Sequence, residues 1–293
     1  MRVAIIGPGR VGTLLAVAGT RAGWRIVAVG GGGAASRARL RAKVAGVRAH
    51  GEPAAAVEGA DLVLLTVPDD AIEEVVDTLV RADVLAAGQD VVHVAGSRGL
   101  AVLRRAGLAG ARIAACHPAM TIPAGATDPE LLVGVPWAVT ARPSDLAWAR
   151  ELVVALGGDP QEVADDARTL YHAALAVASN AVGAAVVTAR RLLLAAHVED
   201  PAAFLGPLGH ASVDNAATVG AAALTGPIVR GDVGTVAAHV AGISADLPEL
   251  LSAYRALARA TLEPVRPTLA PEVVAALEEL LAAPRAEEAT WNG

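Results

Sequence analysis

Polar side chains with useful chemistry interrupt the apolar stretches of this 293-residue chain at a few places. His117 follows one short apolar run, the pair Ser97 and Arg98 follows another, and His172 and Asn180 lie within a long apolar stretch. Histidine has a pKa near neutrality, which suits proton donation. Serine and asparagine can orient a carbonyl group by hydrogen bonds, and arginine can bind a carboxylate bidentately. These residue types together could act on a small carbonyl compound that carries an acid group.

His117 and His172 are alternative candidates for a proton donor. Asn180 has a second explanation, because a buried amide must find hydrogen-bond partners and could form a helix–helix contact instead. Arg230 lies in a loop that contains glycine and proline, where its side chain could reach a substrate carboxylate. The predicted catalytic residues are His117, His172, Asn180 and Ser97, and the predicted substrate-binding residues are Ser97, Arg98 and Arg230.

A glycine-rich loop, Gly7-Pro-Gly-Arg-Val-Gly12, lies between an apolar run and a helical pattern over residues 10–22. This is the context of a dinucleotide-binding fingerprint: Gly7 permits the tight turn, Gly9 lets the backbone approach a pyrophosphate, and Gly12 lets helix and strand pack closely. The helix N-terminus offers unpaired N–H groups to the phosphates. Two further residues, Val67 and Pro68, end a later strand that faces the same crevice. The predicted cofactor-binding residues are Gly7, Gly9, Arg10, Val11, Gly12, Ser36, Arg37, Val67 and Pro68.

The second predicted strand runs into four glycines at residues 30–33, where an NAD-binding protein usually carries an acidic residue. No acidic residue follows until Glu52, whereas Ser36 and Arg37 come soon after the glycines. A carboxylate would repel a 2′-phosphate, and a guanidinium group binds one. The sequence therefore predicts NADP rather than NAD. The alternative is that these arginines form the solvated face of a helix, which applies above all to Arg41.

Residues 1–162 alternate short apolar runs with helical patterns, which is typical of an α/β Rossmann domain with a doubly wound parallel sheet. The predicted strands are residues 3–6, 26–29, 62–67, 91–94, 113–115 and 137–140. A helix over 71–79 is expected to have Asp69 or Asp70 as its N-cap. Few strand signals remain from residue 163, so residues 163–293 are predicted as an all-α C-terminal domain for substrate binding and dimerisation. Its helices are expected over 165–197, 201–222, 233–243, 247–262 and 271–281, before a frayed tail over 284–293.

The composition excludes several other classes of protein. A formal net charge of −6 gives no electrostatic reason to bind nucleic acid or an anionic membrane. The single cysteine, Cys116, excludes a disulfide framework and is expected to be buried, and we predict no metal site. Residues 173–189 are almost wholly apolar, which suits the core of a homodimer better than a membrane span. We find no signal peptide pattern and expect a cytoplasmic protein.

The layout resembles the superfamily of 6-phosphogluconate dehydrogenase, hydroxyisobutyrate dehydrogenase, ketopantoate reductase and pyrroline-5-carboxylate reductase. Ser97 and Asn180 match the substrate-contacting serine and the helical asparagine of the hydroxyacid members. Those enzymes place a catalytic lysine one turn before the asparagine, where this chain has Ala176. The only lysine, Lys43, lies in the predicted cofactor domain, so a histidine is the natural substitute.

A closer resemblance is to a bacterial family with a Rossmann-like N-terminal domain and a helical C-terminal domain of unknown function. It is carried by the segments 7–12, 116–118, 171–180 and 224–232. This resemblance implies NADPH-dependent reduction of a small 2-keto acid, with ketopantoate as the leading substrate. One alternative is an imine reductase or a deazaflavin-linked reductase on the same scaffold. The other is a sensor that binds NADP without turnover.

Overall fold

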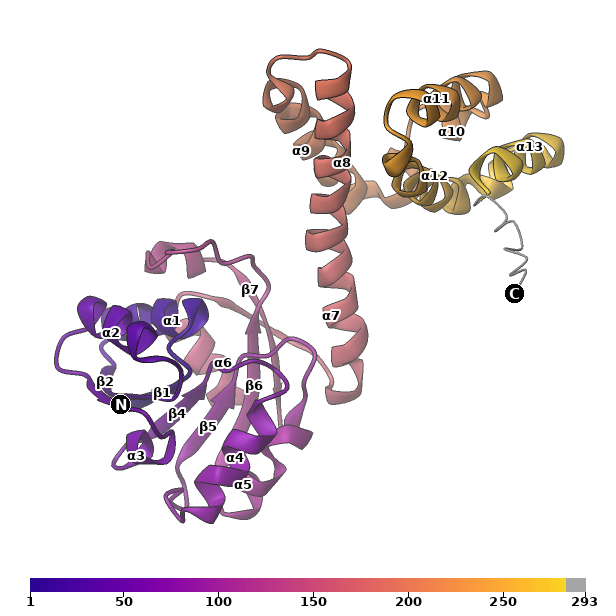
Figure 1. The fold of residues 1–293 in the computed structure, drawn as a ribbon. Helices are drawn as coiled ribbons and strands as arrows, with labels where there is room; N and C mark the ends of the chain where they lie inside the picture. The colour runs from indigo at the N-terminus through magenta and orange to yellow at the C-terminus, as the bar shows by residue number, and fades with distance from the viewer. Residues whose placement is uncertain (283–293) are drawn as a thin grey trace, which may run out of the picture. The chain divides into compact units, whose positions relative to one another are not determined.

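The computed structural model describes residues 1–282, which form two compact units (Figure 1). Unit 1 is Met1–Val177, and unit 2 begins at Ala178. The division falls inside a short π-helical segment, Val177–Ala181. Each unit has its own hydrophobic core, and each is described by itself below.

Unit 1 is built on an eight-stranded sheet with the order β3-β2-β1-β4-β5-β6-β7-β8. The strands are β1 (Arg2–Ile6), β2 (Arg25–Gly30), β3 (Arg48–His50), β4 (Leu62–Leu65), β5 (Asp90–His93), β6 (Arg112–Pro118), β7 (Pro136–Ala141) and β8 (Asp159–Glu162). All neighbours are parallel except β6 and β7. The strand order changes direction between β1 and β4, and such a switch point opens a crevice outside the carboxyl ends of the strands. We call this side of the sheet the carboxyl edge, and the opposite side the amino edge.

Helices cover both faces of this sheet, which explains why its strands are apolar on both sides. In β1, Val3 and Ile5 join one core cluster with Leu14 of the first helix, whereas Ala4 and Ile6 belong to the second cluster. The helices of unit 1 are α1 (Arg10–Arg21), α2 (Ala34–Lys43), α3 (Ala54–Val57), α4 (Ile72–Arg81), α5 (Arg104–Leu108), α6 (Leu146–Ala155) and α7 (Arg168–Ala176). The α/β doubly wound fold predicted for the N-terminal half is therefore confirmed.

Three local expectations for unit 1 differ from the structure. The sequence did not predict β3 and β8, because both strands are short and largely polar. The expected N-cap of α4 is wrong: Ala71 occupies that position without a side-chain hydrogen bond. The run over 137–140 was expected in a parallel strand, but β7 is antiparallel to β6, with Pro118 opposite Trp137. A parallel pair needs a crossover, and residues 119–135 instead form a loop with only a 3₁₀ turn, Pro129–Leu132, that begins and ends at the carboxyl edge.

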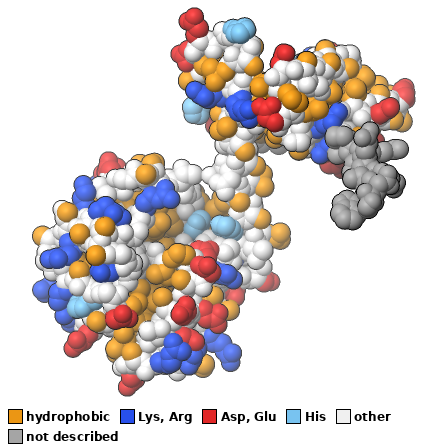
Figure 2. Space-filling model, in the orientation of Figure 1, with side chains coloured by type: hydrophobic (Ala, Val, Ile, Leu, Met, Phe, Trp, Pro, Cys, Tyr) orange, Lys and Arg blue, Asp and Glu red, His pale blue; other side chains and the backbone are white. Residues whose placement is uncertain are grey.

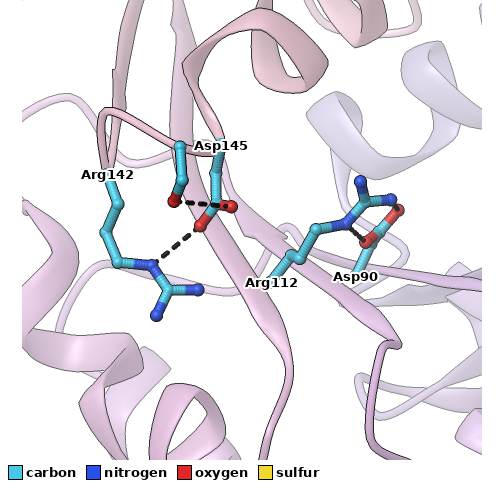
Figure 3. Close-up of polar contacts among 5 residues, drawn as sticks. Asp90, Arg112, Arg142 and Asp145 are labelled. Atoms are coloured by element: carbon cyan, nitrogen blue, oxygen red, sulfur yellow. Dashed lines mark hydrogen bonds and ion pairs between the residues drawn. The ribbon is translucent and has the colours of Figure 1, made fainter.

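Charged side chains at the amino edge are paired with one another (Figure 3). Arg112 donates through Nε and one Nη to the two carboxylate oxygens of Asp90, at 2.7 and 3.0 Å. Its guanidinium group also lies 4.6 Å from the ring centroid of Trp148. Nearby, Arg142 Nε donates to Asp145 Oδ2 at 2.7 Å. Burial raises the pKa of Asp90, and the Arg112 charge opposes that shift.

Unit 2 is helical throughout its described residues. Its helices are α8 (Val182–Ala195), α9 (Pro201–Val219), α10 (Pro227–Arg230), α11 (Val233–Asp246), α12 (Leu251–Val265) and α13 (Pro271–Leu281). A small core joins α10 to α13 through side chains such as Ile228, Val236 and Leu277. None of the residues of α8 is buried. The expected all-α region is confirmed, and the tail expected to be frayed lies outside the described residues.

The stretch Asp165–Ala195 is long and apolar enough to cross a membrane by length and composition. A core helix of a soluble protein passes the same criterion but is mostly buried, whereas the apolar window of this stretch is 0% buried. The beginning of this stretch belongs to unit 1, where Arg168 is buried among polar partners. The remaining apolar part, from residue 173 to 189, is at the short limit for a span.

Candidate functional site

The glycine loop after β1 has the geometry that its sequence predicts. Gly7 has a φ of +100°, and a Cβ there would lie 2.7 Å from backbone atoms of Thr66 and Val67. A Cβ on Gly12 would lie 2.3 Å from the Gly7 carbonyl oxygen. Gly9 is exposed, and a Cβ there would meet no atom within 4 Å. The loop is therefore tight where helix and strand pack and open at the helix N-terminus, where an anion would approach.

The end of β4 is tied to the glycine loop across the switch point of the sheet. Thr66 Oγ1 donates to the Gly7 carbonyl at 2.6 Å. Val67 is half-buried beside this contact, and Pro68 is exposed. Both residues therefore follow a strand whose end opens onto the crevice, as predicted, although their contact with a cofactor stays a prediction.

The segment after β2 gathers cationic and hydroxyl groups. A Cβ on Gly30 would lie 2.8 Å from the Ala56 Cβ, so the acidic residue of an NAD site has no room there. The Arg37 guanidinium group donates to the Gly32 carbonyl and, at 3.1 Å, to the Gly31 carbonyl. Ser36 Oγ accepts a hydrogen bond from Arg39 at 2.7 Å. Figure 2 shows Lys and Arg side chains gathered over this part of unit 1, which suits a 2′-phosphate.

Three aromatic side chains meet at the carboxyl edge. His117, near the end of β6, shares a hydrogen bond of 2.9 Å between its Nδ1 and the Tyr171 hydroxyl. The ring centroid of His117 lies 6.2 Å from that of His172, in a T-shaped arrangement. Gly96 fits closely against both histidines, because a Cβ there would lie 2.5 Å from His172 Cδ2 and 3.0 Å from His117 Nε2. The two predicted histidines therefore belong to one cluster, and Figure 2 shows histidine side chains together on this unit.

The surroundings of His117 keep its imidazole ring neutral. Burial, the Arg168 charge and His172 lower the pKa of His117 to about 4. Burial also raises the pKa of Tyr171, so its hydroxyl keeps its proton at neutral pH. His93 is fully buried, and burial lowers its pKa to about 4 as well. His93 accepts from the Ala95 N–H at 3.2 Å, and its Nε2 lies 3.0 Å from the Gly99 carbonyl, so it has a structural role.

Ser97 and Arg98 lie in the segment that follows β5. Ser97 Oγ donates to Asp69 Oδ2 at 2.9 Å, and both side chains are half-buried. Asp69, expected as a helix cap, is therefore a partner of a predicted catalytic residue. Arg98 is exposed, so its side chain is free to meet a soluble carboxylate.

A cavity of about 210 Å³ connects the glycine loop with the histidine cluster. It is lined by Arg10 and Val11 from the loop, by Val94, His117 and Pro118 at the strand ends, and by Met120 and Ile122 from the loop over 119–135. One Nη of Arg10 donates to the Ile122 carbonyl at 3.3 Å. Small-molecule sites usually occupy about 300–1,000 Å³. The cavity is therefore smaller than a typical small-molecule site, and its volume suits one ring of a ligand together with a small substrate group.

The other predicted residues lie elsewhere. Asn180 and Arg230 are exposed residues of unit 2, Asn180 within the π-helical segment and Arg230 at the end of α10, and their roles stay predictions. Cys116 is buried as expected, and burial raises its pKa to about 12. Among the residues that the structure describes, no group of His, Cys, Asp and Glu could hold a metal ion.

Tyr171 and Asp69 were not among the predicted site residues. Tyr171 bonds His117, and Asp69 bonds Ser97. In both contacts the two residues are far apart in the sequence, so no local pattern reveals them. The one available signal was that Tyr171 directly precedes His172, so that two polar side chains occur together in an apolar stretch.

The fold and this site define a Rossmann-like class of protein, and comparisons with known proteins make that class specific. The family model of the Rossmann-like domain matches residues 1–118. The Domain of unknown function (DUF2520) matches residues 135–261. The chain thus matches a Rossmann-like domain followed by a DUF2520 domain, which confirms the resemblance found in the sequence.

Solved structures share the fold over most of the chain. A proposed NADP oxidoreductase from Bacteroides fragilis is 23% identical, with a TM-score of 0.75, and the match covers 89% of this chain and 98% of that one. An imine reductase from Streptomyces aurantiacus is 18% identical, with a TM-score of 0.67, covering 97% and 100%. An imine reductase from Myxococcus stipitatus, in complex with NADP+, is 18% identical, with a TM-score of 0.62, covering 96% and 100%. No curated protein matches the chain.

Proposed function

We propose that this chain is an NADPH-dependent reductase of a small compound with a C=O or C=N bond. The observation that carries the proposal is the cavity that brings the glycine loop and His117 together. The loop residues Arg10 and Val11 line that space together with His117, which forms a hydrogen bond with Tyr171. A redox cofactor and a proton-transfer group would thus serve one small substrate. The similar folds named as NADP oxidoreductase and imine reductase support this proposal.

The residues present fit NADP(H). Gly9 leaves space at the N-terminus of α1 for the pyrophosphate, and Gly7 and Gly12 hold the tight turn beneath it. Ser36 and Arg37 would bind the 2′-phosphate, while Gly30 leaves no room for a competing carboxylate. When bound, NADPH supplies the hydride.

The proton is the part that this chain must supply. Because the pKa of His117 is about 4, an imidazolium donor is scarce at neutral pH. The Tyr171 hydroxyl keeps its proton and bonds His117 Nδ1 at 2.9 Å. The pair could relay a proton from Tyr171 through His117 to an alkoxide, which is a strong base. Reduction of a protonated imine needs no such donor, so the neutral site favours imines as a second substrate class.

The first experiment measures NADPH oxidation with ketopantoate, 2-ketoisovalerate and pyrroline-5-carboxylate, each also with NADH. We expect NADPH to be preferred and Tyr171→Phe to abolish reduction of the 2-keto acids. The matched control is Tyr254→Phe in unit 2, because the Tyr254 hydroxyl also bonds a histidine, His239 Nδ1, at 2.9 Å. Imine reduction that survives Tyr171→Phe would favour the imine substrate. Tight NADPH binding without turnover of any compound would support a sensor instead.

We also propose that the chain works in the cytoplasm as a homodimer assembled through unit 2. Helix α8 buries none of its residues, and Val187, Phe204 and Leu208 are 60%, 60% and 66% exposed. An apolar groove of about 440 Å³ lies between α8 and α9. Monomeric proteins rarely expose contiguous apolar surface of this kind, and a second copy offers the same surface in return. Arg230 could then act in either subunit.

Analytical ultracentrifugation tests this assembly. We expect a dimer at micromolar concentration and a monomer for Leu208→Glu. Leu108→Glu is the control, because Leu108 is 76% exposed on α5 of unit 1 and should leave the dimer intact. A monomeric parent chain would overturn the proposal.

A further inference from the structure

Arg168, the first residue of α7, is a buried cation that forms no ion pair with the acidic residues of the described range 1–282. Its side chain is 1% exposed. Among the described ion pairs none includes Arg168. Burying a charge is costly unless hydrogen bonds satisfy it. A residue kept in this costly position calls for an explanation beyond packing.

The guanidinium group of Arg168 is satisfied by four neutral oxygens. It donates to the carbonyls of Ala95 at 3.0 Å, Gly96 at 3.3 Å and Ala115 at 3.2 Å. The fourth acceptor is Thr140 Oγ1, at 2.8 Å. These acceptors belong to three neighbouring parts of the sheet: the segment after β5, strand β6 and strand β7. One side chain therefore ties together the strands that carry the site.

The same region of the chain holds the segment after β5 at a second point. Asp165, in the 3₁₀ turn before α7, accepts a hydrogen bond from the Leu100 N–H at 2.6 Å. Its carboxylate also lies against Gly99, where a Cβ would be 2.2 Å from Oδ1. Residues 95–100 are thus fixed from both ends by the beginning of α7. This segment contains Gly96, which contacts both histidine rings, and Ser97.

We propose that Arg168 is the positioning residue of this site: its guanidinium group fixes Gly96 and strand β6 so that His117 and His172 keep their separation. The effect of Arg168 on turnover rests on the proposed function, whereas the effect of Arg168 on His117 does not. A planar fork with five N–H donors can serve four oxygens on three segments, whereas a lysine ammonium has only three donors at one point.

The Arg168 charge has a second effect on the same cluster. His117 faces Arg168, Tyr171 and His172 on α7, with Asp69 after β4 and His93 on β5 as the other titratable neighbours. Burial is the largest cause of the low pKa of His117; Arg168, His172 and His93 lower this pKa further, and Asp69 raises it. Arg168 thus both clamps the segment and adds to the effect of burial on the pKa of His117.

Two substitutions separate the clamp from the charge. Arg168→Lys keeps the charge and loses the fork, so we expect kcat to fall by about 10-fold or more while KM for NADPH stays constant. Arg168→Met loses both, so the pKa of His117, followed by NMR of its ring protons, should also move upward. The control is Arg112→Lys, which alters an arginine at the amino edge and should change neither quantity.

A milder variant keeps the test decisive if Arg168→Met does not fold. Thr140→Val removes one of the four acceptors, and we expect a smaller fall in kcat with an unchanged His117 pKa. If no substrate is found, the NMR titration still tests the inference, because it needs no turnover. An unchanged His117 titration in Arg168→Met, or an unchanged kcat in Arg168→Lys, would overturn it.

Discussion

The two edges of the sheet in unit 1 use the same residue types in opposite ways. At the amino edge, Arg112 pairs with Asp90 through two hydrogen bonds, and Arg142 pairs with Asp145 (Figure 3). At the carboxyl edge, the acceptors described for Arg168 are all neutral, and His117 is held as a neutral imidazole. Paired charges satisfy one another and stabilise the sheet, whereas the Arg168 charge is satisfied by carbonyl and hydroxyl oxygens and helps to lower the pKa of His117, which lines the cavity. The difference separates structural polar groups from those that serve chemistry.

Acidification should disturb the carboxyl edge most. The pKa of His93 is about 4 in the fold against an ordinary value of 6.5, and that of His117 is also about 4. As the pH falls, these histidines are protonated in the unfolded chain before they are protonated in the fold. Their contribution to the free energy of unfolding is therefore fully present above pH 6.5 and is lost as the pH falls towards 4. For His93 alone the loss is on the order of 3 kcal/mol.

Urea unfolding of unit 1, followed by tryptophan fluorescence at neutral pH and near pH 4, checks this expectation. His93→Gln should flatten the pH dependence, and His210→Gln, at an exposed position of unit 2, should not. Equal slopes for the parent chain and His93→Gln would contradict the assigned protonation state.

Adding one methyl group at the carboxyl edge should have the next largest effect. In Gly96→Ala the new Cβ would meet both histidine rings, at 2.5 Å from His172 and 3.0 Å from His117. Such a displacement should lower kcat roughly 100-fold. Binding of NADPH, measured by calorimetry, should stay the same because Gly96 does not line the glycine loop. Gly183→Ala is the control, since a Cβ there meets no atom within 4 Å.

Breaking an ion pair at the amino edge should change stability and leave the chemistry intact. Asp90→Asn removes the charge of a buried carboxylate that bonds Arg112 twice. We expect the free energy of unfolding to fall by about 2 kcal/mol, because charged hydrogen bonds contribute about 1.5–3 kcal/mol. Turnover per folded molecule should match the parent chain. A change in kcat would mean that the two edges are coupled.

The smallest expected effect concerns cofactor preference. Arg37→Gln should weaken NADPH binding about 10-fold, since one charged contact to a phosphate is worth about 1.4 kcal/mol. Binding of NADH should stay constant because it lacks the 2′-phosphate. Arg41→Gln, at an exposed position of the same helix, is the matched control. Equal loss with both nucleotides would remove Arg37 from the phosphate site.

The sequence predicted the parts of the fold that depend on local patterns. Six strands followed from apolar runs, and the glycine loop followed from the spacing of Gly7, Gly9 and Gly12. The strand β8 and the direction of β7 were missed, because they depend on pairing rather than on hydrophobicity. The π-helical segment Val177–Ala181 was missed because its residues also suit an α-helix.

The candidate site was predictable only in part for the same reason. His117, His172 and Ser97 were recognised as polar residues near strand ends or on an apolar helix. Their partners Tyr171 and Asp69 could not be chosen from sequence, since each contact joins segments far apart in the chain.

The antiparallel direction of strand β7 affects how the sequence of this protein could evolve. Because β6 ends and β7 begins at the carboxyl edge, residues 119–135 are a loop that starts and ends at this edge and lines the cavity with its first residues. A crossover in a parallel sheet would have to carry the chain back beneath the strands. This loop can instead lengthen, shorten or exchange its side chains at Met120 and Ile122 without altering the order of the strands. New substrate preferences could therefore evolve, or be engineered by grafting, in one segment while the cofactor machinery is inherited unchanged.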